Sequence, residues 1–218
     1  MKHLETKGIS FIAEPFGGDG SWYFGINYEQ GDLYEAEEIF RAGGDVKGRR
    51  FCLIRCPDGE VFWPVEKRAG AYPGEAVQEG GRIYFPEADF TEGLLRIIGF
   101  DCESHEVKTE AEIPLSEIRD CYNLRLSVRP LTLTRQGGED RLFEVIWPEK
   151  ASFPLHPHES FFLRDGEKLY FNHWYEEGEG GDYRFWEETV VRNLQGEVLE
   201  TLPGDVRLMP DGELWHLG

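Results

Sequence analysis

Short strand-like runs recur along this chain at a nearly constant spacing, and this recurrence constrains the fold more than any other feature. Four such runs begin 44 to 48 residues apart: Phe51–Cys56, Leu95–Phe100, Arg141–Ile146 and Thr189–Leu194. Each is followed by a second apolar stretch: Val61–Val65, Val107–Leu115, Ala151–Leu155 and Val198–Leu202. Gly, Asp and Glu residues separate the runs, which is typical of many short antiparallel strands. The pattern therefore predicts an all-β protein.

A shorter motif precedes several of these runs and combines a glycine with an apolar-aromatic pair. It occurs as Gly20-Ser21-Trp22-Tyr23-Phe24, Gly81-Arg82-Ile83-Tyr84-Phe85, Gly166-Glu167-Lys168-Leu169-Tyr170-Phe171 and Gly212-Glu213-Leu214-Trp215-His216. Asp-Gly pairs at Asp58-Gly59 and Asp211-Gly212 lie between apolar runs. Such pairs are a strong hairpin signal because glycine tolerates the positive φ that tight turns require. The expected unit is thus a set of hairpin-linked strands.

Units of about 45 residues with several strands each resemble the repeats of β-propellers, and the resemblance covers nearly the whole chain. It implies one domain over residues 1–218, a small propeller of about five antiparallel blades, although four or six blades also fit the 218 residues. A closing blade is expected to combine Asp205–Met209, Glu213–Leu217 and an N-terminal strand near His3–Thr6. The WD dipeptide and the glycine pair that mark WD40 and kelch repeats do not occur in register with this repeat. No named family is indicated, and no catalytic residue is carried over.

The segment Gly31–Gly44 allows two interpretations. Asp32 is a suitable helix N-cap, Leu33, Ala36 and Phe40 would share one helical face, and Gly43 is a suitable stop. The spacing from Tyr23-Phe24 to Asp32-Leu33-Tyr34, however, resembles that from Tyr170-Phe171 to Asp182-Tyr183-Arg184. That similarity favours a strand, and a strand is the prediction.

Charge restricts the partners. Asp and Glu number 42 against 23 Lys and Arg, a formal net charge of −19. A chain so acidic repels phosphate backbones and anionic lipid headgroups, so neither nucleic-acid binding nor membrane binding is expected. The first residues form no apolar signal-peptide core, and no apolar run approaches the ~20 residues of a membrane span. A cytoplasmic location is expected, with Cys52, Cys56, Cys102 and Cys121 reduced.

Four connections would occupy equivalent places between units and emerge on one face of a propeller. They are residues 68–75, 116–123, 154–159 and 203–205, and each contains an acid: Glu75, Asp120, Glu159 or Asp205. Such a ring of carboxylates would favour a cation, an amine or a sugar, and two of them would suit a glycosidase. Tyr72, Tyr122, His156 and His158 lie in the same loops and complete the candidate binding face. The alternative is that the acids only form Asx turns or remain solvated.

The segment Leu155-His156-Pro157-His158-Glu159 groups several side chains that can bind a metal ion. In an extended strand His156 and His158 would point the same way, so that these imidazoles and Glu159 would be candidate ligands of a zinc-like ion. His173 is a candidate third histidine. A purely structural loop accounts for the same residues, because a His-x-His pattern is common.

No phosphate-binding loop, zinc-protease motif, nucleophile elbow or EF-hand loop occurs in the sequence. No cofactor is indicated, and whether the protein is an enzyme is left open. The favoured function is a binding or scaffold domain for a protein or small-molecule ligand. The alternatives are a glycoside hydrolase using the acids of the channel mouth, and a metal-binding protein centred on His156 and His158.

Overall fold

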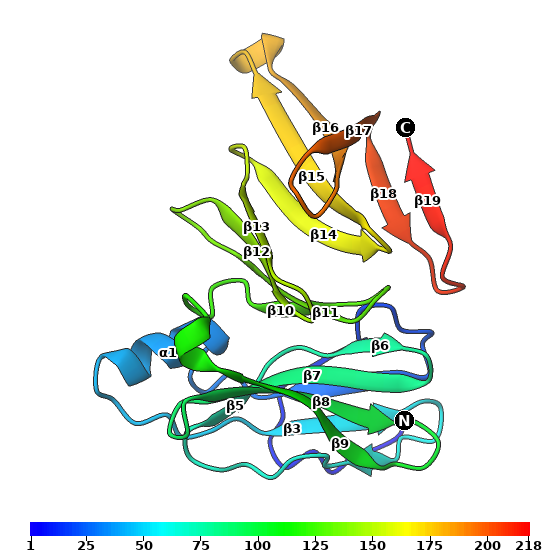
Figure 1. Cartoon of the computed structure of the whole chain (residues 1–218). Helices are drawn as coiled ribbons and strands as arrows, with labels where there is room; N and C mark the ends of the chain where they lie inside the picture. Colours follow the sequence, from blue (N-terminus) through cyan, green and yellow to red (C-terminus); the bar gives the residue numbers. More distant parts are fainter. The chain divides into compact units, whose positions relative to one another are not determined.

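Antiparallel strands dominate the computed structural model, which describes residues 1–218 (Figure 1). The chain divides into two compact units, Met1–Leu126 and Ser127–Gly218. No helix in the structure is long and apolar enough to cross a membrane. The prediction of one domain over residues 1–218 stays a prediction, and each unit is described separately.

Two sheets make up the first unit. The first follows chain order and contains β1 (Phe11–Ala13), β2 (Trp22–Ile26), β3 (Phe51–Arg55) and β4 (Val61–Phe62). The second has the order β5-β7-β8-β9 and contains β5 (Ala71–Pro73), β7 (Arg82–Asp89), β8 (Leu94–Asp101) and β9 (Val107–Pro114), while β6 (Val77–Glu79) pairs with another part of β7. A 3-10 turn (Leu115–Glu117) follows β9.

These two sheets pack through their apolar faces. Side chains alternate along a strand, so β2 and β3 place Phe24, Phe51 and neighbouring residues on one face, against Phe85 and Phe100 of β7 and β8. The rings of Phe51 and Phe85 stack with centroids 4.1 Å apart. Face-to-face contact between successive four-stranded sheets is how propeller blades bury their surfaces.

The second unit repeats this construction. Its first sheet contains β10 (Arg125–Ser127, at the boundary between the units), β11 (Thr132–Gln136), β12 (Leu142–Trp147) and β13 (Ala151–Pro154), and its second contains β14 (Glu159–Asp165), β15 (Lys168–Glu177), β16 (Arg184–Arg192) and β17 (Val198–Pro203). A 3-10 turn (Gly180–Asp182) joins β15 to β16. Phe143, Phe161 and Phe171 form the centre of the core between the two sheets.

The predicted all-β, propeller-like fold is confirmed, but the number of blades differs from the expected five. Four antiparallel sheets of blade type are present instead of five. The runs used for the prediction, at Phe51, Leu95, Arg141 and Thr189, fall in β3, β8, β12 and β16, the third strand of each sheet.

The predicted closing blade is wrong. β18 (Asp205–Leu208) and β19 (Leu214–Leu217) pair only with each other, and no strand forms at His3–Thr6. Val206 and Leu214 instead pack against the buried residues Leu163 and Val191 of the last sheet. The hairpin thus buries its apolar side without joining a blade.

The strand predicted within Gly31–Gly44 is also wrong, because Leu33–Arg41 forms the α-helix α1. Asp32 is its N-cap, and its carboxylate accepts hydrogen bonds from the backbone N–H groups of Tyr34 and Glu35 at 2.9 and 3.0 Å. Glu35 accepts a bond from the Asp32 N–H in return, which completes a capping box. These local bonds satisfy the first helical N–H groups, and Leu33 and Ala36 face the core.

Candidate functional site

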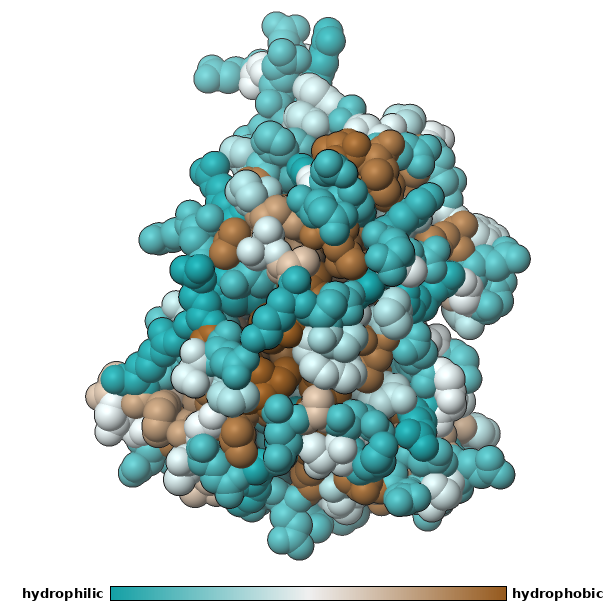
Figure 2. Space-filling model, in the orientation of Figure 1, coloured by the Kyte–Doolittle hydropathy of each residue, from teal (hydrophilic) through white to brown (hydrophobic).

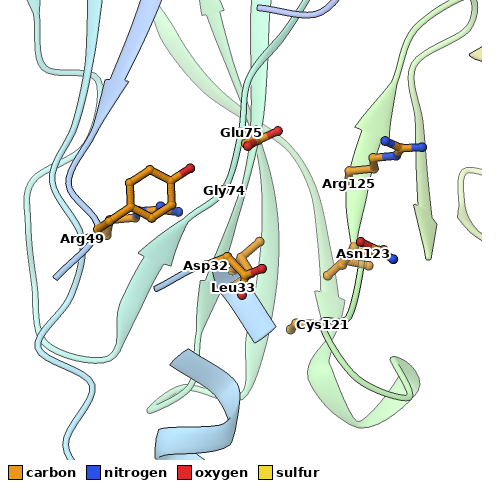
Figure 3. A pocket seen from close by; sticks show the side chains of 10 residues that line it. Asp32, Leu33, Arg49, Gly74, Glu75, Cys121, Asn123 and Arg125 are labelled. Atoms are coloured by element: carbon orange, nitrogen blue, oxygen red, sulfur yellow. The ribbon is translucent and has the colours of Figure 1, made fainter. Parts of the chain in front are cut away.

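A polar pocket of about 170 Å³ lies in the first unit. Five segments contribute to it: the turn after β2, the start of α1, the stretch before β3, the turn after β5, and the loop before β10 with the first residue of that strand (Figure 3). The lining residues are Tyr28, Asp32, Leu33, Arg49, Gly74, Glu75, Cys121, Asn123, Leu124 and Arg125. We call this cavity the Arg49 pocket.

Two hydrogen bonds hold these segments together. The hydroxyl of Tyr72, on β5, donates to the carbonyl oxygen of Gly31 at 2.7 Å and fixes the turn before α1. Glu37 of α1 is buried, and its carboxylate accepts a bond from the backbone N–H of Cys121 at 2.6 Å. β5 therefore anchors the turn that precedes α1, and α1 anchors the loop that leads to β10.

Arg49 is the central feature of the pocket because its guanidinium is buried and incompletely bonded. Its side chain is only 3% exposed. Nε donates to the carbonyl oxygen of Asn27 and Nη1 to that of Pro73, both at 3.1 Å. Nη2 has no hydrogen-bond partner. Buried polar atoms in folded proteins are normally paired, so the N–H groups of this nitrogen indicate a missing acceptor.

Two aromatic rings confine the guanidinium. Its central carbon lies 4.8 Å from the ring centroid of Tyr28 and 4.9 Å from that of Tyr72. Each ring face attracts the cation. Tyr28 is 44% exposed, so this side of the site faces solvent.

The electrostatics of the pocket are mixed. Burial lowers the pKa of Arg49, while Tyr72, Tyr28 and Glu75 raise it. The group remains charged, because an arginine pKa starts above 12. No carboxylate is hydrogen-bonded to this buried cation, although Asp32 and Glu75 stand on the pocket wall. The site thus offers donors from Arg49 and acceptors from the acids to one small molecule.

The sequence-predicted residues of this unit have different positions relative to the pocket. Glu75 is exposed and lines it. Tyr72 is buried (1% exposed) on β5, where its ring contacts the guanidinium of Arg49. Asp120 accepts a hydrogen bond from the N–H of Tyr122 at 3.0 Å, and the ring of Tyr122 meets that of Tyr34 edge-on. Both flank Cys121 without lining the pocket.

In the second unit, Glu159 and Asp205 are each engaged by an arginine. Glu159 is buried (4% exposed), and its oxygens accept bonds from Nε and Nη2 of Arg192 at 2.7 and 3.0 Å. Asp205 accepts a bond from Nε of Arg207 at 2.6 Å. A carboxylate held in this bidentate way, as Glu159 is, is not available as a glycosidase acid or base.

The predicted metal ligands do not converge. His158 has a φ of 65° in the turn between β13 and β14, so the extended backbone expected for His156–His158 is absent. The ring of His158 stacks on Trp174 with centroids 3.7 Å apart, whereas His156 lies parallel to His173 at 6.4 Å. Glu159 is bound to Arg192, and no group of three or more His, Cys, Asp or Glu residues in the structure is arranged to hold a metal ion.

Sequence reasoning did not identify Arg49, Tyr28, Asn123 or Arg125. Two lining residues were singled out by the sequence: Glu75 as a loop acid of the candidate binding face, and Asp32 as a suitable helix N-cap. The burial of Arg49 depends on contacts with Asn27 and Pro73, which are 22 and 24 residues away. No local pattern encodes such contacts.

No protein-family model matches the chain, and no curated protein matches it significantly in sequence.

Proposed function

We propose that the protein is a non-catalytic binding protein whose Arg49 pocket takes a small molecule bearing a carboxylate. One observation carries the proposal: Nη2 of the buried Arg49 has no hydrogen-bond partner in a polar cavity. A guanidinium edge matches the geometry of a carboxylate, and charged hydrogen bonds of this type are stronger than neutral ones. A bound carboxylate would also neutralise the buried cation.

The acids on the wall narrow the ligand class further. Asp32 and Glu75 oppose a ligand with several negative charges and favour one with a donor or a cation at its other end. The cavity of about 170 Å³ holds a compact molecule, since one water occupies about 30 Å³ in the liquid. A small zwitterion, of the amino-acid type, combines these properties.

Binding is a better account than catalysis because the pocket holds no nucleophile paired with a base. Cys121 is its only thiol, and burial and the neighbouring Glu37 raise the pKa of that thiol, which stays protonated at neutral pH. No histidine lines the pocket.

Four small probes test the proposal: glycine, acetate, glycinamide and acetamide. They separate the carboxylate from the ammonium group on a nearly constant frame. We expect glycine to bind most tightly, acetate more weakly, and the two amides not measurably, in calorimetric or NMR titrations. Equal binding of acetate and acetamide would contradict the proposal.

The matched variants are Arg49→Lys and Arg50→Lys. Lysine keeps the charge of Arg49 but loses the planar fork, so glycine affinity should fall about tenfold to a hundredfold. Arg50 donates to the carbonyl oxygen of Lys7 outside the pocket, and its lysine variant should bind as the original chain does. If Arg49→Lys does not fold, the Arg49 side-chain NMR signals of the original protein decide the matter: they should shift with glycine and not with acetamide.

A further inference from the structure

The β15–β16 hairpin extends beyond the sheet to which it belongs. β14 pairs with β15 only as far as His173, and β17 pairs with β16 only as far as Glu188. Four more pairs continue the hairpin, from Trp174–Glu187 to Glu177–Arg184. At the base of these pairs the Trp174 N–H donates to the carbonyl oxygen of His158, and the Gly204 N–H donates to that of Glu187. No third strand flanks the pairs beyond this base, so residues 174–187 form a two-stranded arm, which Figure 1 shows reaching past β14 and β17.

Aromatic rings cover both faces of the arm. On one face the rings of His173, Tyr175 and Trp186 stack, with centroids 4.2 and 5.1 Å apart. On the other face His158 stacks on Trp174 at 3.7 Å, and Phe185 follows at 6.3 Å. A two-stranded hairpin alone is marginally stable in water, so these stacks are what keeps the arm formed.

Much of this aromatic surface faces solvent. Tyr183, Phe185 and Trp186 are 52%, 53% and 41% exposed. In Figure 2 the end of the arm is hydrophilic, and hydrophobic atoms are exposed on the surface below it. Large aromatic side chains gathered on an open strand edge are typical of interaction surfaces, because the unpaired backbone groups can accept another strand.

Charge selects the partner. Residues 173–188 carry six acids and one base: Glu176, Glu177, Glu179, Asp182, Glu187, Glu188 and Arg184. A second copy of this chain would bring two such acidic arms together, and the whole chain already carries a net charge of −19. A basic segment would instead pair with the glutamates and place its cations over the exposed rings.

Two of the acids are already oriented by phenols. The hydroxyl of Tyr175 donates to Glu188 at 3.0 Å, and that of Tyr183 donates to Glu176 at 3.2 Å. Each bond uses one carboxylate oxygen and leaves the charge in place beside an aromatic ring. Ring face and carboxylate together suit a guanidinium or an ammonium group.

We infer that the arm docks an extended, Lys- and Arg-rich segment of a partner protein by strand addition. The surface lies in the second unit and shares no residue with the Arg49 pocket. The inference is therefore independent of the proposed function. The partner would pair its backbone with an open edge of the arm and lay its basic side chains across Trp186, Phe185 and the adjacent acids.

An alternating Arg-Val decapeptide tests this inference on the full chain, with an alternating Glu-Val decapeptide as control. Fluorescence anisotropy should show binding of the basic peptide only. Trp186→Ser should weaken that binding about tenfold or more, since a single interface tryptophan often dominates an interface. Trp215→Ser is the matched control, because Trp215 is 50% exposed on β19, away from the arm.

A second variant tests the inference if Trp186→Ser disrupts the structure of the arm. Charge reversal at Glu179 and Asp182 changes the tip without breaking a side-chain bond, and it should reduce both the affinity and its dependence on salt. Equal binding of both peptides, no binding, or equal losses for Trp186→Ser and Trp215→Ser would each overturn the inference. So would a dimer in sedimentation that Trp186→Ser dissociates, because the occupant would then be a second copy.

Discussion

Glu159 and Arg192 form a buried, bidentate ion pair, with nitrogen–oxygen distances of 2.7 and 3.0 Å. Glu159 also accepts a bond from the backbone N–H of His156 at 2.9 Å, and Arg192 donates to the carbonyl oxygen of Gly196 at 2.7 Å. The pair thus joins the turn before β14 to the turn after β16. Glu159, which the sequence predicts as a site residue, therefore has a structural role.

Glu159→Gln tests this structural role. The amide keeps the shape but leaves the Arg192 charge uncompensated in a buried place, so the free energy of unfolding should fall by about 3–5 kcal/mol. Urea denaturation measures the change. Asp205→Asn is the control, since the Asp205–Arg207 pair is exposed and should contribute at most about 1 kcal/mol. Equal effects of the two substitutions would show that burial does not matter here.

Asp32→Ala removes the N-cap of α1. Two backbone N–H groups lose their acceptor, and the free energy of unfolding should fall by about 1 kcal/mol. Because Asp32 also lines the Arg49 pocket, glycine binding should weaken as well, which a titration would detect. Asp45→Ala changes an exposed acid outside the pocket and should leave both quantities unchanged.

His173 should titrate below the ordinary histidine range. Burial lowers its pKa most, while Glu159 and Glu188 raise it. The folded pKa therefore lies below the unfolded value near 6.5, so His173 contributes stability that is complete above that pH and is lost as pH falls through the folded pKa.

NMR titration of the His173 ring checks that its folded pKa lies below its unfolded value. Glu188→Gln removes a raising charge and should lower the pKa of His173 further. Glu187→Gln, whose side chain points to the opposite face of the hairpin, should have a smaller effect. A midpoint above 6.5 would contradict the placement of His173.

The four cysteines should differ strongly in reactivity, because all are unpaired but only Cys56 is exposed. Burial raises the pKa of Cys52 to about 12 and that of Cys102 to about 11, which keeps both thiols protonated. A thiol reagent at neutral pH should modify Cys56 first in the folded protein and all four residues in urea. Cys56→Ser should remove the fast phase, and rapid modification of buried Cys52 would contradict the packing of β3.

The strands could be predicted from the sequence because their signals are local. Recurring apolar runs predicted β3 and β8 correctly, and in the expected Asp58-Gly59 turn after β3 the Asp58 carboxylate accepts a bond from the N–H of Glu60. The helix at Leu33–Arg41 was missed although Asp32 and Glu35 have capping-box spacing, because the similarity to Tyr170–Arg184 was given more weight. A local helix signal was therefore present, but the prediction followed a weaker similarity to a segment far away in the sequence.

The candidate site was much less predictable. Glu75 was identified, but Arg49 gains its role from the carbonyl oxygens of Asn27 and Pro73 and from the rings of Tyr28 and Tyr72. The histidines of the turn before β14 were overinterpreted, because the positive φ of His158 separates two rings that an extended chain would align. Such features depend on the packing of the whole unit.

The most direct measurement of the central claim is a crystal structure of the protein grown with saturating glycine. The account predicts one glycine in the Arg49 pocket, with a carboxylate oxygen within hydrogen-bond distance of Nη2 of Arg49 and the ammonium group toward Asp32 or Glu75. A pocket filled by water under conditions where glycine binds elsewhere, or a carboxylate turned away from Arg49, would contradict it.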